Sequence, residues 1–205
     1  ERLRQAGLPA HQIIIWDRKD RDLQRAGYKI CTDGKSVQCY GNDRAGFTRQ
    51  LFEFGSVGSQ LSRTLYETCT AVINLPVLKD HVITGVTGAL KNFYGSINNP
   101  NKYHMNAGNP FIADVNMLQP IRQKTRLHLC DALIAQYEGG PPFMPQWSWP
   151  MQSLLASFDP VAMDQKIWDI VEAKRREQGI ESLTTAGRRP NYIATAADAE
   201  HRIGV

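Results

Sequence analysis

The chain has 205 residues, of which 42% are hydrophobic and 21% are charged, a composition typical of a globular domain with a full-sized core. Its formal net charge is only +4 and its basic residues are scattered, so we expect no nucleic-acid binding. The tightest basic cluster, residues 174–176, lies between Glu172 and Glu177, which is typical of a solvent-exposed helix face. No apolar run approaches the ~20 residues of a membrane-spanning helix, so we expect no membrane span.

Residues 1–7 have the pattern of a helix end closed by a glycine. A natural chain would begin with Met and a lead-in, so we expect that an N-terminal segment, with any targeting signal, is missing.

Short apolar runs alternate with helical segments along the chain. In chain order, we predict a strand at residues 13–16, a helix at 21–26, strands at 37–40 and 51–54, a helix at 62–68, a strand at 71–75, helices at 87–94 and 110–122, strands at 127–132 and 153–156, and helices at 160–178 and 194–201. Pro120 must end or kink its helix. This alternation predicts one α/β domain over residues 1–205, with a mostly parallel sheet, helices on both faces and a small β-hairpin excursion at 37–54.

Ligands of such sheets bind beyond the carboxyl ends of the strands. The polar residues that follow the predicted strands are Asp17, Arg18, Lys79, His81, Asp131, Ser157 and Asp159. A carboxylate that ends a buried strand needs a partner, and for Asp131 the simplest is Lys79 or Lys91, with a ligand, a metal or a loop N–H as alternatives.

Asp159 precedes Pro160, a pair typical of a helix start, with Asp164 then near the positive end of the helix dipole. The position of Asp159 at a strand end leaves a ligand or metal role open.

Residues 79–95 carry the strongest functional pattern. We expect Lys79 and His81 in a loop, followed by small residues that lead into a helix with Lys91. Small residues let the backbone approach a ligand, and free N–H groups at a helix N-terminus favour an anion. We therefore expect Thr87 to cap this helix and Gly88 to help bind an anion.

Two side chains in this segment are catalytic candidates. His81 suits proton transfer or metal binding, and Lys91 suits a point charge or, with a lowered pKa, a nucleophile or base. The candidates for binding an anion or cofactor are Lys79, Thr87, Gly88, Asn92 and Asp131, and those for a metal are His81, Asp131 and Asp159. His104, in a later polar loop, is either a second site histidine or a solvated one. The alternative interpretation gives the segment no function. Lys91 is then a surface lysine of a helix, His81 is a loop histidine, and the glycines only form turns.

Residues 73–81 and 85–92 resemble the signature of the domain of unknown function 362 family, and residues 156–164 resemble its second hallmark. The tail from residue 187 to residue 204 also fits. The resemblance implies that a further strand and helix precede the chain. Some members of the family carry iron–sulfur clusters, but the four cysteines of this chain form no Cys-x-x-Cys pair, so we expect none here. Others carry a twin-arginine signal, which leaves cytoplasmic and exported locations open.

The pattern His81-x3-Gly85-x-Thr87-Gly88-x2-Lys91 is also similar to a loop of nickel-pincer lactate racemases. In that family the lysine carries a covalently attached nickel cofactor, so this resemblance implies a lysine-linked cofactor on Lys91.

The leading hypothesis is a cofactor-dependent enzyme that transfers a proton or hydride at a small carboxylate. The alternative is a non-catalytic module that binds an anion or docks a redox partner. The aromatic segment at residues 143–150 is either a lid, a contact between subunits in a homo-oligomer, or plain packing.

Overall fold

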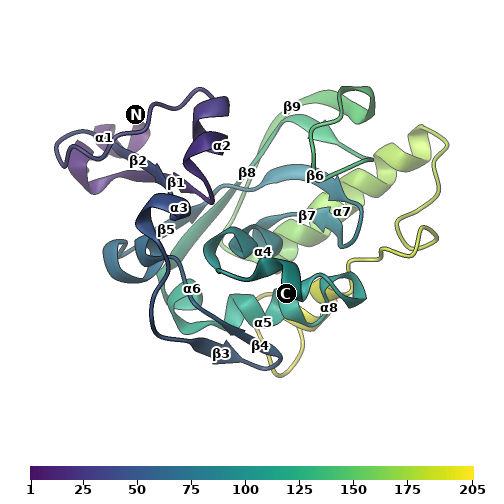
Figure 1. Ribbon diagram of the computed structural model, residues 1–205. Helices are drawn as coiled ribbons and strands as arrows, with labels where there is room; N and C mark the ends of the chain where they lie inside the picture. Colours follow the sequence, from purple (N-terminus) through teal and green to yellow (C-terminus); the bar gives the residue numbers. More distant parts are fainter.

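The computed structural model describes residues 1–205 and contains two small sheets and one five-stranded sheet (Figure 1). The N-terminal elements are α1 (Arg2–Gln5), the 3-10 helix η1 (Ala10–Gln12), β1 (Ile14–Asp17), α2 (Asp20–Arg25), β2 (Gln38–Gly41) and α3 (Asn42–Ala45). β1 and β2 pair in parallel, with Ile14 opposite Gln38, and α2 packs against both strands.

The β-hairpin excursion is formed by other strands than expected. β3 (Phe52–Phe54) pairs in antiparallel fashion with β4 (Val57–Ser59), whereas β2 joins β1. Gly55 turns this hairpin with a φ of +52°, and a Cβ there would lie 2.7 Å from a carboxylate oxygen of Asp114. The π-helix η2 (Thr64–Thr68) then leads to the main sheet.

The main sheet consists of β5 (Val72–Asn74), β6 (Val77–His81), β7 (Gly85–Thr87), β8 (Thr125–Gln136) and β9 (Ser148–Ser157). β8 pairs in parallel first with β5 and then with β6, and in antiparallel fashion with β9. β7 pairs in antiparallel fashion with β6, so the sheet is mixed, and the expected mostly parallel arrangement is only partly shown. Pro76 separates β5 from β6, because proline has no N–H for the strand pairing.

The remaining helices are α4 (Ala89–Asn92), η3 (Phe93–Ser96), η4 (Pro100–Tyr103), η5 (Asn106–Gly108), α5 (Phe111–Met117), α6 (Gln119–Lys124), η6 (Pro145–Trp147), α7 (Pro160–Glu177) and α8 (Tyr192–Ala196). The helix expected at 110–122 is interrupted at Leu118, and Pro120 lies in the first turn of α6, where a proline removes no hydrogen bond. None of the helices combines the length and the apolar character that a membrane span requires.

α7 runs along one face of the main sheet and contacts β6, β7, β8 and β9 (Figure 1). Leu78 and Asp80 of β6 are fully buried. On the opposite face Ile73, Leu75 and Val77 are 38%, 60% and 41% exposed. Helices therefore leave this part of the second face uncovered, which differs from the expected helices on both faces.

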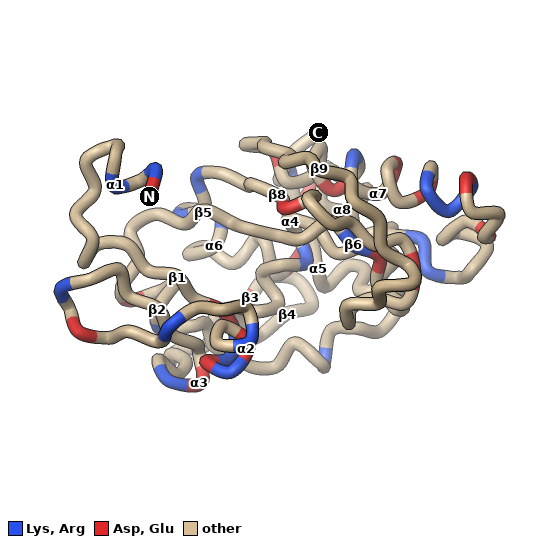
Figure 2. Tube along the Cα trace, turned by 90° about the horizontal axis from the view of Figure 1, so that it is seen from above, with Lys and Arg blue, Asp and Glu red and all other residues tan.

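Basic and acidic residues are interspersed along the chain trace (Figure 2).

The expectation that residues 174–176 form a solvent-exposed cluster is wrong for Arg175. This side chain is 1% exposed and donates hydrogen bonds to the carbonyl oxygens of Tyr137 (2.9 Å) and Glu181 (2.8 Å). It also binds the carboxylate of Glu138, which is shared with Arg188. Through these contacts Arg175 connects the end of α7 with Tyr137 and Glu138 in the loop after β8, and Glu138 connects this loop with Arg188 in the C-terminal segment.

Replacing Arg175 with Met should lower the free energy of unfolding by about 3 kcal/mol, because the buried carbonyl groups and Glu138 lose a cationic donor. The matched control is Arg176→Met one position further on, where the side chain is exposed and the loss should stay below about 1 kcal/mol. Urea denaturation of both variants measures the difference. Equal losses would show that the buried network contributes nothing specific to stability.

Candidate functional site

Lys79 and His81 lie in β6 rather than in a loop. In the antiparallel pairing of β6 with β7, Lys79 is opposite Thr87 and His81 is opposite Gly85. Side chains of directly opposite residues project from the same face of a sheet, as do those of residues two apart in one strand. Lys79, His81 and Thr87 therefore share one face of the hairpin.

The short helix α4 brings Lys91 to two histidines. Lys91 is 6% exposed, and its Nζ lies 3.1 Å from Nε2 of His104 and 4.4 Å from the centroid of the Tyr94 ring. The His104 ring stacks on the His81 ring, with centroids 5.6 Å apart. Lys79, His81, Lys91 and His104 together are called the basic cluster below.

The hydrogen bonds of the two histidines assign their protons. His104 Nδ1 lies 3.0 Å from the carbonyl oxygen of Pro100, which only accepts, so Nδ1 carries the hydrogen and Nε2 accepts from Lys91. His81 Nδ1 accepts from the N–H groups of Ile83 (3.1 Å) and Thr84 (3.3 Å). His81 Nε2 therefore carries the hydrogen in the neutral ring, which makes it a donor and leaves it no lone pair for a metal.

Burial and mutual repulsion lower the pKa values of the basic cluster. Burial, together with the charge of Lys79, lowers the pKa of Lys91 to about 8. Burial, followed by the charges of Lys91 and His104, lowers the pKa of His81 to about 3, and burial and Lys91 also lower the pKa of His104. No member of the cluster forms an ion pair with a carboxylate. Burial also lowers the pKa of Lys79, although the charges of Asp80 and Asp17 act in the opposite direction. The cluster thus contains no ion pair, and carboxylate charges act on Lys79 alone.

The carboxylate of Asp164, from α7, caps the N-terminus of α4. It accepts hydrogen bonds from the N–H groups of Ala89 (2.5 Å) and Leu90 (3.2 Å), and burial raises its pKa to about 7 despite these bonds. A Cβ at Gly88 would lie 2.2 Å from the Asp164 carboxylate, so only glycine fits there. The expectation that Thr87 caps this helix is therefore wrong. The N–H groups that follow Gly88 also bind Asp164 rather than an external anion.

Gly85 has a comparable structural role. Its φ is +82°, and a Cβ there would lie 2.3 Å from the carbonyl oxygen of Arg188. Gly85 and Gly88 thus permit close contact with other parts of the chain.

The other predicted site residues lie outside the basic cluster. Asn92 donates to Asn74 Oδ1 (2.6 Å). Asp131 is exposed, accepts from the N–H of Leu133 (2.9 Å) and forms no ion pair, so the expected pairing with Lys79 or Lys91 is wrong.

The three metal candidates do not converge. Asp159 caps α7 by accepting from the N–H groups of Val161 and Ala162, and Asp131 is opposite Val77, at the other end of β6 from His81. The structure contains no group of three or more His, Cys, Asp or Glu side chains arranged to hold a metal ion.

Sequence reasoning missed the role of Asp164, which it assigned to the dipole of its own helix. It left His104 undecided between a site residue and a solvated one. Neither contact follows from local spacing, because Asp164 is 75 positions from Ala89 and His104 is 13 positions from Lys91. The second family hallmark, residues 156–164, was the one signal that pointed to Asp164.

Comparison with protein families gives a match over residues 5–169 to the family described as Domain of unknown function (DUF362). The chain belongs to this family. The matched region of this DUF362 protein contains the whole basic cluster and Asp164. No curated protein and no solved structure matches the chain, and the resemblance to lactate racemases is not confirmed.

Replacing Gly88 with Ala should lower the free energy of unfolding by about 1–3 kcal/mol, because the added methyl group collides with the Asp164 carboxylate. Gly95→Ala is the matched control in the same motif, since a Cβ at Gly95 meets no atom within 4 Å. Thermal or urea denaturation of the two variants tests this contact. Equal stability of the Gly88→Ala and Gly95→Ala proteins would contradict this expectation.

Proposed function

We propose that the basic cluster binds a small carboxylate-bearing molecule and transfers a proton at it. The observation that carries this proposal is the contact between the buried Lys91 and the half-buried His104, in a group of basic side chains that forms no ion pair with a carboxylate. Uncompensated buried charge is costly, and a bound anion removes that cost.

Four groups are available to bind the anion. Lys91 donates one hydrogen bond, to His104, and His81 presents its Nε2–H. Lys79 Nζ donates to the carbonyl oxygen of Pro141 (2.9 Å) and retains further N–H groups. Thr87 adds a buried hydroxyl that has no hydrogen-bond partner and that projects from the same face as Lys79. The two oxygens of a carboxylate are acceptors for such donors.

Proton transfer is supported by the pKa of Lys91, which is lowered to about 8. A group with a pKa close to the working pH populates both its acid and its base form, which general acid–base catalysis requires. The Nε2 atom of His104 accepts a hydrogen bond from Lys91 and thereby orients the lysine. The same lone pair makes His104 a second acceptor for the transferred proton. His81, with a pKa of about 3, remains a neutral donor at neutral pH.

The same donors also fit a non-catalytic anion-binding or redox-partner-docking site. At neutral pH the His81 imidazole is neutral and can only hold a ligand through its N–H. This property favours the non-catalytic alternative. Proton exchange at the bound molecule distinguishes the two functions.

Binding of acetate, used as the simplest probe, should depend on Lys91. Lys91→Met should raise the Kd at least about tenfold, because a charge-assisted hydrogen bond is lost. In the native protein the affinity should fall as the pH rises through about 8, where Lys91 loses its proton. Lys102→Met is the control, since this nearby lysine is exposed. Titration followed by NMR measures the Kd, and an equal Kd for all three proteins would refute the site.

Catalysis should appear in D2O as exchange of solvent deuterium into a carbon-bound hydrogen of small carboxylates, at C2 of a 2-hydroxy acid or at C3 of a 2-oxo acid. A panel of 2-hydroxy and 2-oxo acids, followed by mass spectrometry, should include at least one that exchanges with the native protein. Lys91→Met and His104→Gln should each abolish the exchange, whereas Lys102→Met should retain it. Binding without exchange across the panel would favour the non-catalytic module, and an adduct on Lys91 in the intact mass would assign that lysine to a cofactor.

A further inference from the structure

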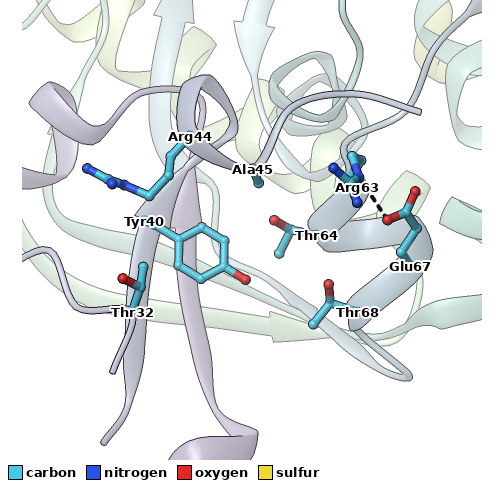
Figure 3. Close-up of a pocket in the computed structure, with 8 residues that line it drawn as sticks. All are labelled: Thr32, Tyr40, Arg44, Ala45, Arg63, Thr64, Glu67 and Thr68. Carbon is cyan, nitrogen blue, oxygen red and sulfur yellow. Dashed lines mark hydrogen bonds and ion pairs between the residues drawn. The ribbon is translucent and has the colours of Figure 1, made fainter. Parts of the chain in front are cut away.

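A second polar site lies between β2 and the π-helix η2, apart from the basic cluster. The cavity has a volume of about 270 Å³ and is lined by Tyr40 of β2, by Thr64 and Thr68 of η2, and by Arg44 and Arg63 beside them (Figure 3). In Figure 3 the hydroxyl oxygens of Tyr40, Thr64 and Thr68 surround the space between the two elements. None of these residues belongs to the site proposed above.

Thr64 has an unexplained polar atom at this site. The residue is 1% exposed, and its Oγ1 is buried without any hydrogen-bond partner. A buried hydroxyl that lacks a partner costs roughly 1–3 kcal/mol, so such groups in folded proteins call for a function or a bound molecule. The backbone around Thr64 is also irregular, because its carbonyl oxygen accepts from the N–H of Cys69 five positions on (2.9 Å). Single π-turns of this kind occur frequently at functional sites.

The charges around the cavity favour an anion. The charged side chains that line it are Arg44, Arg63 and Glu67, and in Figure 3 the guanidinium group of Arg44 points away from the three hydroxyl groups. Arg63 pairs with Glu67 (2.8 Å) and Arg44 pairs with Asp20 (2.6 Å), and both arginine side chains are more than half exposed. Ion pairs that exposed are weak, so a dianion can recruit the remaining N–H groups of each arginine.

We propose that this cavity binds the phosphoryl group of a small phosphomonoester. The three hydroxyl groups and the N–H groups of Arg63 that Glu67 does not bind are donors for the oxygens of a phosphoryl group. The volume corresponds to about nine water molecules, at roughly 30 Å³ each, so it also accommodates a small organic part beside the phosphoryl group. The hydroxyl of Thr64 lies at the buried wall of the cavity and gains its missing partner when the ligand binds.

The test uses glycerol 3-phosphate, inorganic phosphate and glycerol as separate probes. Chemical-shift changes of the backbone amides of Thr64 and Thr68 report binding at this cavity rather than at the basic cluster. We expect glycerol 3-phosphate to bind more tightly than inorganic phosphate, and glycerol to cause no change. Binding of inorganic phosphate but not of glycerol 3-phosphate would assign the cavity to a free anion and overturn the phosphomonoester assignment. Binding of glycerol as tight as that of glycerol 3-phosphate would overturn it as well.

Thr64→Val is the decisive variant because it keeps the shape of the side chain and removes only the hydroxyl. It should unfold at the same temperature as the native protein or a higher one, since the lost hydroxyl has no partner, yet its Kd for glycerol 3-phosphate should rise about tenfold. Thr64→Ser should restore binding. Thr70→Val, at an exposed threonine outside the cavity, and Lys91→Met should both bind as the native protein does. An unchanged Kd for Thr64→Val would overturn the proposal.

Discussion

The position of Lys91 depends on one buried interaction, the cap that Asp164 places on α4. A four-residue helix has little stability of its own, so its orientation must come from tertiary contacts. Asp164 supplies such a contact by binding the first two free N–H groups of the helix, and Gly88 permits the close approach. α7 is thereby joined to the segment that carries the basic cluster.

The alternation of side chains in β6 explains why the cluster forms no ion pair with Asp80. Asp80 lies between Lys79 and His81 in the sequence, but it projects from the opposite face of the strand. There it pairs with Arg188 (3.1 Å) and accepts from the N–H of Gly140 (2.8 Å). The nearest carboxylate in the sequence thus pairs within the buried network, and it acts on Lys79 only through its charge and not as an ion pair.

The α/β class, the family and most strands could be predicted from the sequence, because apolar runs and a specific motif are local signals. The β6–β7 hairpin was not predicted, since Lys79 and His81 make the end of β6 polar and resemble a loop. A shared site of Lys79, His81 and Lys91 was predicted from their position after one strand and stays a prediction, whereas the isolation of Asp131 and Asp159 was not expected. Their separation depends on the register of β8 and on the packing of α7, which a single sequence does not encode locally.

The most direct test of this account is the titration of Lys91 by NMR, with 13C-labelled lysine and the Lys91→Met protein to assign the signal. A lysine that is buried beside other cations and has no carboxylate partner should titrate at about 8. The account would be contradicted by a signal for Lys91 that titrates near 10.4, the ordinary value for a lysine in water. Such a result would mean that the charge of Lys91 is either solvated or neutralised within the chain.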